Sequence, residues 1–165
     1  SGARLPGLLS FWWLALPLAS FLALGWAGTG GPYESTYPLL LIIIVWINDT
    51  FAYLTGRFFG RHQLTPRLSP GKTWEGTAGG MLFSMLSGWV VHRLTGTLNA
   101  PVWILLSGLI ALLGLAGDLF ESSLKRRKGL KNMGTLLPGH GGILDRFDSL
   151  LFAAPVILIL LNWLS

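Results

Sequence analysis

The sequence predicts an all-α fold, a polytopic transmembrane helix bundle of about five spanning helices with two basic cytoplasmic loops. Of the 165 residues, 52% are hydrophobic and only 12% are charged, and the mean hydropathy is +0.59. This balance is typical of integral membrane proteins and not of soluble domains. The apolar residues also fall into five runs, each close to the roughly 20 residues that a helix needs to cross a bilayer. We therefore expect residues 1–165 to form a single membrane-embedded domain.

The five runs cover residues 6–27, 37–54, 74–94, 101–120 and 147–164. The first carries Trp12 and Trp13 near one end, where Trp side chains anchor helices at the membrane interface. The second is rich in Ile and Val, but we expect a helix because lipid cannot satisfy free backbone polar groups. The third contains Gly76, Gly80 and Gly88, small residues at spacings that let helices approach closely.

The basic residues indicate how the spans are oriented. Five crossings put the N-terminus and the loops 56–73 and 121–146 on one side, together with eleven of the twelve Lys and Arg residues, and leave only Arg93 on the other. The positive-inside rule makes the basic side cytoplasmic. The net charge of +5 is then concentrated next to the membrane, so we do not expect a nucleic acid as a partner.

Residues 117–148 hold the densest group of polar side chains, with four of the seven acids and six of the twelve basic residues. Asp118 lies at the end of the fourth run, and Asp145 and Asp148 lie three apart at the start of the fifth, on one helix face. Together the three carboxylates are a candidate site for a divalent cation. His140, within PGHGG, is a candidate phosphate contact or acid–base group.

Plainer interpretations of the same stretch stay open. Glu121 and Lys125 are spaced for an ion pair within one helix. The basic run 125–128 could serve only to attract anionic lipid.

The loop before the third run contains SPGKTWEG, residues 69–76, which is similar to a phosphate-binding loop. The Walker pattern is not met, because its first glycine is missing and we expect no strand before it. This segment could nevertheless bind phosphate by the same kinds of interaction. Gly71 frees backbone N–H groups, Lys72 supplies charge, and Thr73 can cap a helix whose N-terminus favours an anion. The alternative is an ordinary helix cap beside a Lys that reaches for the interface.

Asn48 and Asp49 lie late in the second run, within WINDTFAY. A carboxylate is costly in lipid and normally faces a cavity or a partner. We therefore expect these two residues to line a polar cavity. The alternative is that Asp49 pairs with a base and serves helix packing.

These motifs together resemble those of the phosphatidate cytidylyltransferases, also called CDP-diacylglycerol synthases. The family signature is Ser-x-apolar-Lys-Arg, four residues, Lys-Asp, then Pro-x-His-Gly-Gly-apolar-x-Asp-Arg-apolar-Asp. Its positions here are Ser122, Leu124, Lys125, Arg126, Lys131, Pro138, His140, Gly141, Gly142, Asp145, Arg146 and Asp148. SPGKTWEG, the run from Asp49 to Tyr53 and the Gly117-Asp118 pair are also similar to family features, so the resemblance covers roughly residues 37–165. Asn132 stands where the family has Asp, which weakens any metal-binding role of that position.

The resemblance implies an enzyme, a nucleotidyltransferase that transfers a cytidylyl group from CTP to phosphatidic acid and releases pyrophosphate. The product would be CDP-diacylglycerol for phospholipid biosynthesis. The resemblance implies Mg²⁺ as a cofactor, a lipid bilayer as the surroundings, and a bacterial inner membrane with the active site facing the cytoplasm. A second cation and a homodimer stay open. Family members usually have further N-terminal membrane helices, so we expect this chain to correspond to their C-terminal catalytic part.

The resemblance and the chemistry of the residues together imply three groups of site residues. The expected catalytic residues are Asp118, Lys125, His140, Asp145 and Arg146. The expected substrate-binding residues are Asn48, Asp49, Ser69, Lys72, Thr73, Arg126, Gly141 and Gly142. The expected metal ligands are Asp118, Asp145 and Asp148.

Two other functions stay open at this point. One is a CTP-dependent polyprenol or phytol-type lipid kinase, in which a lipid alcohol would attack the γ-phosphorus. The other is an inactive membrane subunit whose basic face binds anionic lipid. The acids and the His-Gly-Gly motif argue against the second, because attraction to anionic lipid requires only bases.

Overall fold

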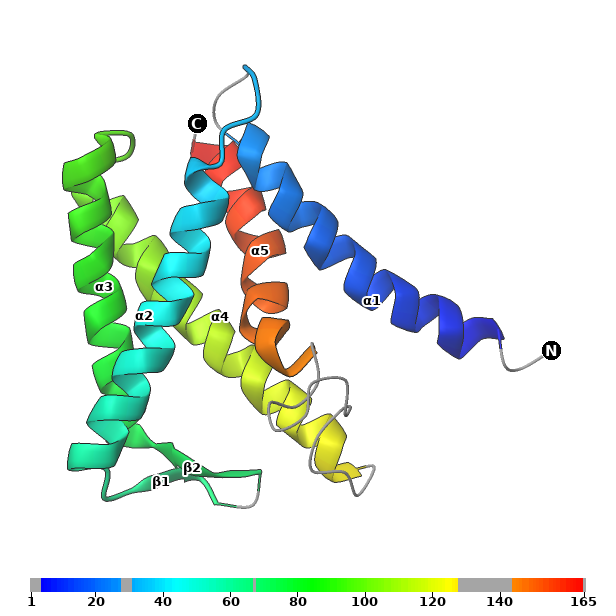
Figure 1. Cartoon of the computed structure of the whole chain (residues 1–165), viewed down its shortest axis with the longest axis vertical. Helices are drawn as coiled ribbons and strands as arrows, with labels where there is room; N and C mark the ends of the chain where they lie inside the picture. Colours follow the sequence, from blue (N-terminus) through cyan, green and yellow to red (C-terminus); the bar gives the residue numbers. More distant parts are fainter. Residues whose placement is uncertain (1–3, 28–30, 67, 128–143, 165) are drawn as a thin grey trace.

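The computed structural model describes residues 4–27, 31–66, 68–127 and 144–164, with residues 4–13, 127 and 144–148 described by their backbone only (Figure 1). The elements are α1 (Arg4–Ala23), the short 3-10 helix η1 (Leu24–Trp26), α2 (Thr36–Phe59), β1 (Gln63–Thr65), β2 (Ser69–Thr73), α3 (Trp74–Thr95), α4 (Ala100–Arg127) and α5 (Leu144–Leu164). Each of the five predicted apolar runs overlaps one of the five long helices. The chain is therefore mostly helical, as the sequence predicts.

The prediction was wrong about the loop between the second and third runs, which contains a short β-hairpin. Strands β1 and β2 pair antiparallel, with Gln63 opposite Thr73 and Thr65 opposite Ser69. A turn closes the hairpin, because the Leu68 N–H donates to the Thr65 carbonyl at 3.2 Å. Pro66 follows Thr65, at the turn position where a fixed φ is favourable. A strand therefore does precede α3, contrary to our expectation.

Helix α4 is longer than the fourth apolar run and continues about two turns past residue 120. Lys125 pairs with Glu121 across one of these turns, at 3.0 Å between Nζ and Oε1. A Glu followed four residues later by Lys stabilises a helix. The polar end of α4 is consequently a continuation of the same rigid element that carries Asp118.

The glycines of α3 bring it into close contact with both of its neighbours. A Cβ at Gly80 would lie 2.8 Å from the Asn48 carbonyl oxygen on α2, and one at Gly88 would lie 2.4 Å from the Trp103 carbonyl oxygen on α4. Distances this short exclude any side chain at either position unless the helices move apart. The prediction of close helix packing through small residues is thus confirmed.

The apolar core lies where α2, α4 and α5 meet, at the end of the bundle distant from the hairpin. Its buried residues include Leu41, Ile44, Leu106, Ile110, Ala154, Ile157 and Leu161. Helix α1 packs mainly against α5 (Figure 1). Close packing at this end leaves the opposite end of the bundle, next to the hairpin, as the place where a pocket opens.

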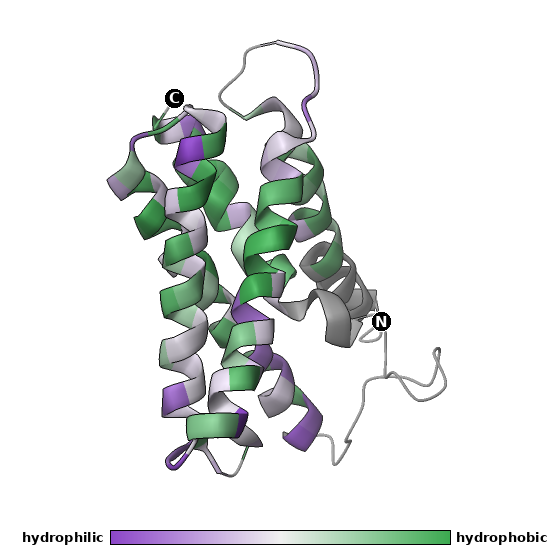
Figure 2. Cartoon of the chain, turned by 60° about the vertical axis from the view of Figure 1, so that its left-hand side comes forward, coloured by the Kyte–Doolittle hydropathy of each residue, from purple (hydrophilic) through white to green (hydrophobic). Residues whose placement is uncertain are grey.

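The outward faces of the helices are strongly apolar. Trp46, Leu105 and Ile159 are each 68% exposed, and hydrophobic residues dominate the middle of the described helices in Figure 2. Among the residues whose side chains are described, two stretches are long and apolar enough to cross a membrane, namely Thr36–Phe59 of α2 and Ala100–Arg126 of α4. The other three predicted spans stay predictions.

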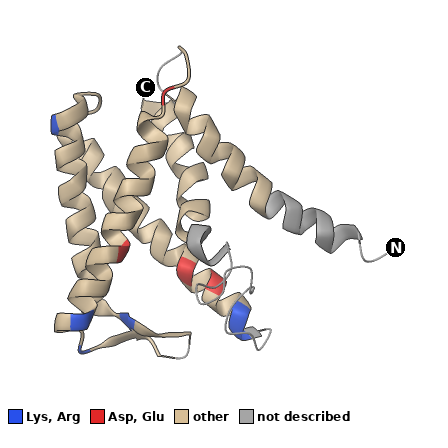
Figure 3. Cartoon of the chain, in the orientation of Figure 1, with Lys and Arg blue, Asp and Glu red and all other residues tan. Residues whose placement is uncertain are grey.

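The described basic side chains are concentrated at one end of the bundle (Figure 3). Arg57 lies in the last turn of α2, Lys72 on β2 and Arg126 near the end of α4, whereas Arg93 lies in the last turn of α3, at the opposite end. This distribution matches the two sides expected from the sequence. Which side faces the cytoplasm stays a prediction.

Candidate active site

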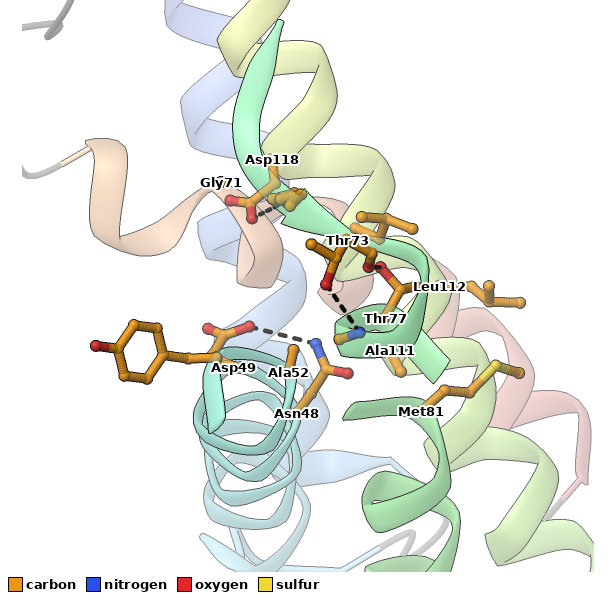
Figure 4. Close-up of a pocket in the computed structure, with 14 residues that line it drawn as sticks. Asn48, Asp49, Ala52, Gly71, Thr73, Thr77, Met81, Ala111, Leu112 and Asp118 are labelled. Carbon is orange, nitrogen blue, oxygen red and sulfur yellow. Dashed lines mark hydrogen bonds and ion pairs between the residues drawn. The ribbon is translucent and has the colours of Figure 1, made fainter. Parts of the chain in front are cut away.

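A pocket of about 230 Å³ opens between α2, α3, α4 and strand β2 (Figure 4). Its polar lining residues are Asn48, Asp49, Tyr53, Lys72, Thr73, Thr77 and Asp118. Its apolar lining residues are Ala52, Met81, Ala111, Leu112 and Leu115. The pocket therefore joins a charged mouth beside the hairpin to an apolar wall within the bundle, as a site for a molecule with a polar and an apolar part would require.

Lys72 and Asp118 form an ion pair across the mouth of this pocket, although 46 residues separate them in the sequence. Strand β2 supplies the ammonium group and α4 supplies the carboxylate. The side chains are 25% and 34% exposed, respectively. Both charges thus stay within reach of a ligand that enters from the hairpin side.

Thr73 joins the hairpin to α3 and caps that helix. Its backbone is extended, and its Oγ1 accepts a hydrogen bond from the Gly76 N–H at 3.1 Å. The Thr77 hydroxyl in turn donates to the Thr73 carbonyl at 3.0 Å. The predicted cap is confirmed, and it brings the N-terminus of α3 to the pocket, where backbone N–H groups and the helix dipole favour an anion.

Asn48 and Asp49 line the same pocket from α2, as expected from their place in an apolar run. The Asn48 Nδ2 donates to the Asp49 Oδ1 at 3.3 Å. Asn48 lies where α2 and α3 touch, because Gly80 approaches its backbone and side chain. The distance between these two helices therefore determines where the amide group lies.

A second set of contacts fixes the hairpin to the start of α3. The His62 N–H donates to Glu75 Oε2 at 3.3 Å, and His62 Nδ1 lies 2.6 Å from Glu75 Oε1. The Trp74 N–H donates to the His62 carbonyl at 3.0 Å. These bonds hold the start of strand β1 against the first turn of α3, next to Lys72 and Thr73.

Three of the expected substrate-binding or catalytic residues lie outside the pocket lining. Ser69 begins β2 at the turn end of the hairpin. Lys125 pairs with Glu121 farther along α4, which bears out the plainer interpretation of that spacing, and Arg126 follows it on the same helix. Their roles in binding phosphate stay predictions.

The remaining expected site residues are only partly covered by the structure. His140, Gly141 and Gly142 lie outside the described residues. Asp145, Arg146 and Asp148 lie in the first turns of α5, where the backbone alone is described. Within the side chains that are described, no three His, Cys, Asp or Glu residues come together as a metal site, so the three-carboxylate site stays a prediction.

The backbone of α5 nevertheless has a known register against α4. The Ser149 hydroxyl donates to the Gly114 carbonyl at 3.3 Å, and the two helices run antiparallel (Figure 1). Asp145 lies about one turn before Ser149 on α5, and Asp118 lies about one turn after Gly114 on α4. The start of α5 is therefore level with Asp118.

Thr77 and Tyr53 were not predicted as site residues, although both line the pocket. Tyr53 lies four residues after Asp49 on the same face of α2, and Thr77 lies four residues after Thr73, the residue that caps α3. Helical periodicity could have found them. The apolar wall offers no such signal, because Met81 and Leu112 look like any other apolar residue of a membrane helix.

Comparison with known proteins places the chain within a family. A sequence model described as the cytidylyltransferase family matches residues 7–164. Proteins named phosphatidate cytidylyltransferase from Staphylococcus epidermidis and Staphylococcus aureus are each 47% identical over 127 residues, which is 76% of this chain and 48% of theirs. The Staphylococcus saprophyticus protein of the same name is 45% identical over the same length. The chain thus spans about half the length of the curated relatives it matches.

A solved structure has a similar fold. It is described as an intramembrane enzyme for archaeal membrane lipids biosynthesis, and it is 28% identical with a TM-score of 0.52 over 73% of this chain and 77% of its own. This likeness agrees with the two apolar helices of membrane-spanning length and with the exposed apolar faces. The chain is an integral membrane protein.

Proposed function

The chain belongs to the cytidylyltransferase family, and from this premise we propose that it transfers the cytidylyl group of CTP to phosphatidic acid. The products are CDP-diacylglycerol and pyrophosphate, as part of phospholipid biosynthesis. The observation that carries the proposal is the pocket itself, in which Lys72, Asp118 and the N-terminus of α3 meet an apolar wall. That combination suits a phosphate on one side and a lipid on the other.

The reaction requires no nucleophile from the protein. A phosphate oxygen of phosphatidic acid attacks the α-phosphorus of CTP and forms the new P–O bond. The bond between the α-phosphorus and the bridging oxygen to the β-phosphate breaks, and pyrophosphate leaves with the electron pair. The protein therefore has to hold two polyanions in line and neutralise their charge.

The described residues can supply these functions from one pocket. Lys72 provides an ammonium group for a phosphate, and the Thr73 cap places backbone N–H groups of α3 beside it. Leu112 lines the pocket and is also 47% exposed on the outer face of α4. The apolar wall thus continues to the lipid-facing surface, where acyl chains can enter between helices.

The pocket also suits Mg²⁺, which prefers oxygen ligands and commonly takes one or two carboxylates together with substrate phosphates. Asp118, Asp49 and Asn48 bring such oxygens to the pocket, and the start of α5 is level with Asp118. We propose that Asp118, Asp145 and Asp148 hold the cation. When bound, it would neutralise phosphate charge and favour departure of pyrophosphate.

The remaining predicted residues complete the proposal. Lys125, Arg126 and Arg146 would bind phosphates of CTP or of the lipid, His140 would contact a phosphate, and Ser69 and the turn at Gly141 and Gly142 would donate hydrogen bonds. The basic end of the bundle would face the cytoplasm of a bacterial cell, where CTP is present. The second cation and the homodimer stay predictions.

The test is transfer of label from CTP to lipid. The purified chain is mixed in detergent with dioleoyl phosphatidic acid and with CTP labelled at the α-phosphate, with Mg²⁺ or with EDTA. We expect metal-dependent label in the lipid fraction and an equal amount of pyrophosphate. Transfer of label from the γ-phosphate to a lipid alcohol, with release of CDP, would instead identify the kinase and overturn the proposal.

Asp118→Asn is the variant that tests the metal assignment in the same assay. We expect this variant to turn over roughly 100-fold more slowly than the wild type. The reason is that a weakened metal contact would remove about 3 kcal/mol of transition-state stabilisation. Glu34→Gln is the matched control, because it removes the same charge from an exposed position just before α2, at the far end of the bundle. Near-normal turnover of Asp118→Asn in a folded protein would contradict the metal assignment.

A further inference from the structure

The Lys72–Asp118 pair brings together two groups that the proposed reaction needs for different purposes. The ammonium of Lys72 is the group suited to a phosphate, and the carboxylate of Asp118 is the group suited to a cation. In this structure the Lys72 ammonium, on β2, donates a hydrogen bond to the Asp118 carboxylate, on α4, across the pocket mouth. A phosphate that approaches Lys72 therefore meets an ammonium group that already donates to Asp118.

We propose that the Asp118 carboxylate holds the place of a substrate phosphate on Lys72, and that Asp118 thereby makes the pocket select cation-complexed polyphosphates over free ones. The identity of the natural anion, a nucleoside triphosphate, rests on the proposed function. The competition itself rests on the ion pair alone. Asp118 is in this respect a specificity-determining residue, in addition to any role as a metal ligand.

The physical argument begins with the acceptors. A carboxylate oxygen and a phosphate oxygen both accept charge-assisted hydrogen bonds from an ammonium group, so they compete for the same donors. A free polyphosphate entering the pocket would also meet two negative charges, because Asp49 lines the same cavity as Asp118. Displacing Asp118 would take the Lys72 ammonium away from a carboxylate that is only 34% exposed, which is costly.

A divalent cation removes both obstacles at once. When it binds Asp118, the carboxylate has a new partner and Lys72 becomes available to the phosphate. Cation and phosphate then strengthen each other's binding, and the coupling has the same size in both directions. The pocket would accordingly reject metal-free nucleotide and admit the metal complex.

A simpler explanation makes a different prediction. If Asp118 only repels anions through its charge, then removing it should raise anion affinity whether or not Lys72 is present. If Asp118 acts by occupying Lys72, the gain should disappear when Lys72 is absent. A double-mutant cycle separates the two explanations, because it isolates the pairwise interaction.

The experiment measures binding of inorganic tripolyphosphate in EDTA by titration calorimetry, with the full chain in detergent. The proteins are the wild type, Asp118→Asn, Lys72→Gln and the double variant, with Asp49→Asn as a matched removal of charge from the same pocket. We expect Asp118→Asn to bind tripolyphosphate at least about tenfold more tightly than the wild type. In the Lys72→Gln background the same substitution should change affinity less than about twofold, and Asp49→Asn should gain less than Asp118→Asn.

A second titration adds Mg²⁺. Wild-type affinity for tripolyphosphate should rise at least about tenfold with the cation, whereas Asp118→Asn should gain much less. Thermal unfolding checks that each variant is folded, and Asp118→Ser serves as a second charge-removing variant if Asp118→Asn does not fold. An equal gain from removing Asp118 in both Lys72 backgrounds, or no gain in either, would overturn the inference.

These titrations use neither CTP nor lipid, so their outcome is independent of the transfer assay. A chain that transfers no cytidylyl group but shows the expected cycle would retain the inference and lose the proposed function. A chain that transfers the cytidylyl group but does not show the expected double-mutant cycle would retain the proposed function and lose the inference.

Discussion

Thr73 shows how a single side chain can determine the geometry of the pocket mouth. Its hydroxyl caps α3 through the Gly76 N–H, and its methyl group fills the space beside Gly60, where a Cβ would lie 2.8 Å from Thr73 Cγ2. Lys72 precedes it directly. The cap therefore fixes both the direction of the helix N-terminus and the start of the strand that carries the ammonium group.

Thr73→Val tests this role, because it retains the shape of the side chain and removes the hydroxyl. Loss of an N-cap costs about 1 kcal/mol, which lowers the melting temperature of a chain of this size by roughly 2–4 °C. Thr73→Ser keeps the hydroxyl and should retain most of the stability. The measurement is thermal unfolding in detergent, with the exposed Thr97→Val as a control that changes stability by less than about 0.5 kcal/mol. A Thr73→Val melting temperature equal to that of the wild type would show that the cap does not stabilise α3.

At the scale of elements, the contact between α2 and α3 connects helix packing to the site. Gly76 and Gly80 lie one turn apart on α3, and a Cβ at either would lie within 2.8 Å of a backbone oxygen of α2. Backbone cannot move aside as the end of a flexible side chain can. Asn48, which supplies one of those oxygens, also lines the pocket, so widening this contact would move part of the site.

Gly80→Val should consequently destabilise the protein and disturb the pocket together. Overpacking typically costs about 1–3 kcal/mol, and we expect a corresponding fall in melting temperature with weaker tripolyphosphate binding in Mg²⁺. Gly71→Ala is the matched control for stability, because nothing lies within 4 Å of a Cβ there. If Gly80→Val unfolds at the same temperature as Gly71→Ala, the two helices are not as closely packed as the structure shows.

At the scale of the whole molecule, most of the helical fold could be predicted because each long helix corresponds to one apolar run in the sequence. Asn48 and Asp49 could also be predicted as pocket residues, since a carboxylate within such a run needs a polar neighbour. The hairpin could not, because strands as short as Gln63–Thr65 leave almost no pattern. The Lys72–Asp118 pair could not be predicted from the sequence either, because only tertiary packing brings together residues that are 46 positions apart.

The orientation of the whole bundle is the remaining feature that the sequence predicts and a direct measurement can decide. The chain has no cysteine, so a single introduced thiol reports one place without background. Arg61→Cys labels the exposed segment between α2 and the hairpin, and Thr97→Cys labels the exposed turn between α3 and α4, at the opposite end. In intact bacterial cells, a membrane-impermeant maleimide should modify Thr97→Cys and not Arg61→Cys, because the basic end is expected in the cytoplasm.

The comparison with inverted membrane vesicles completes this measurement, since there the cytoplasmic face is outermost and the labelling pattern should reverse. A detergent-solubilised sample, in which both thiols should react, controls for reactivity. Labelling of both positions from the same side would mean that α3 does not cross the bilayer. The opposite sidedness at both positions would place the Lys72–Asp118 mouth on the side without CTP, and the proposed reaction would then lack its nucleotide.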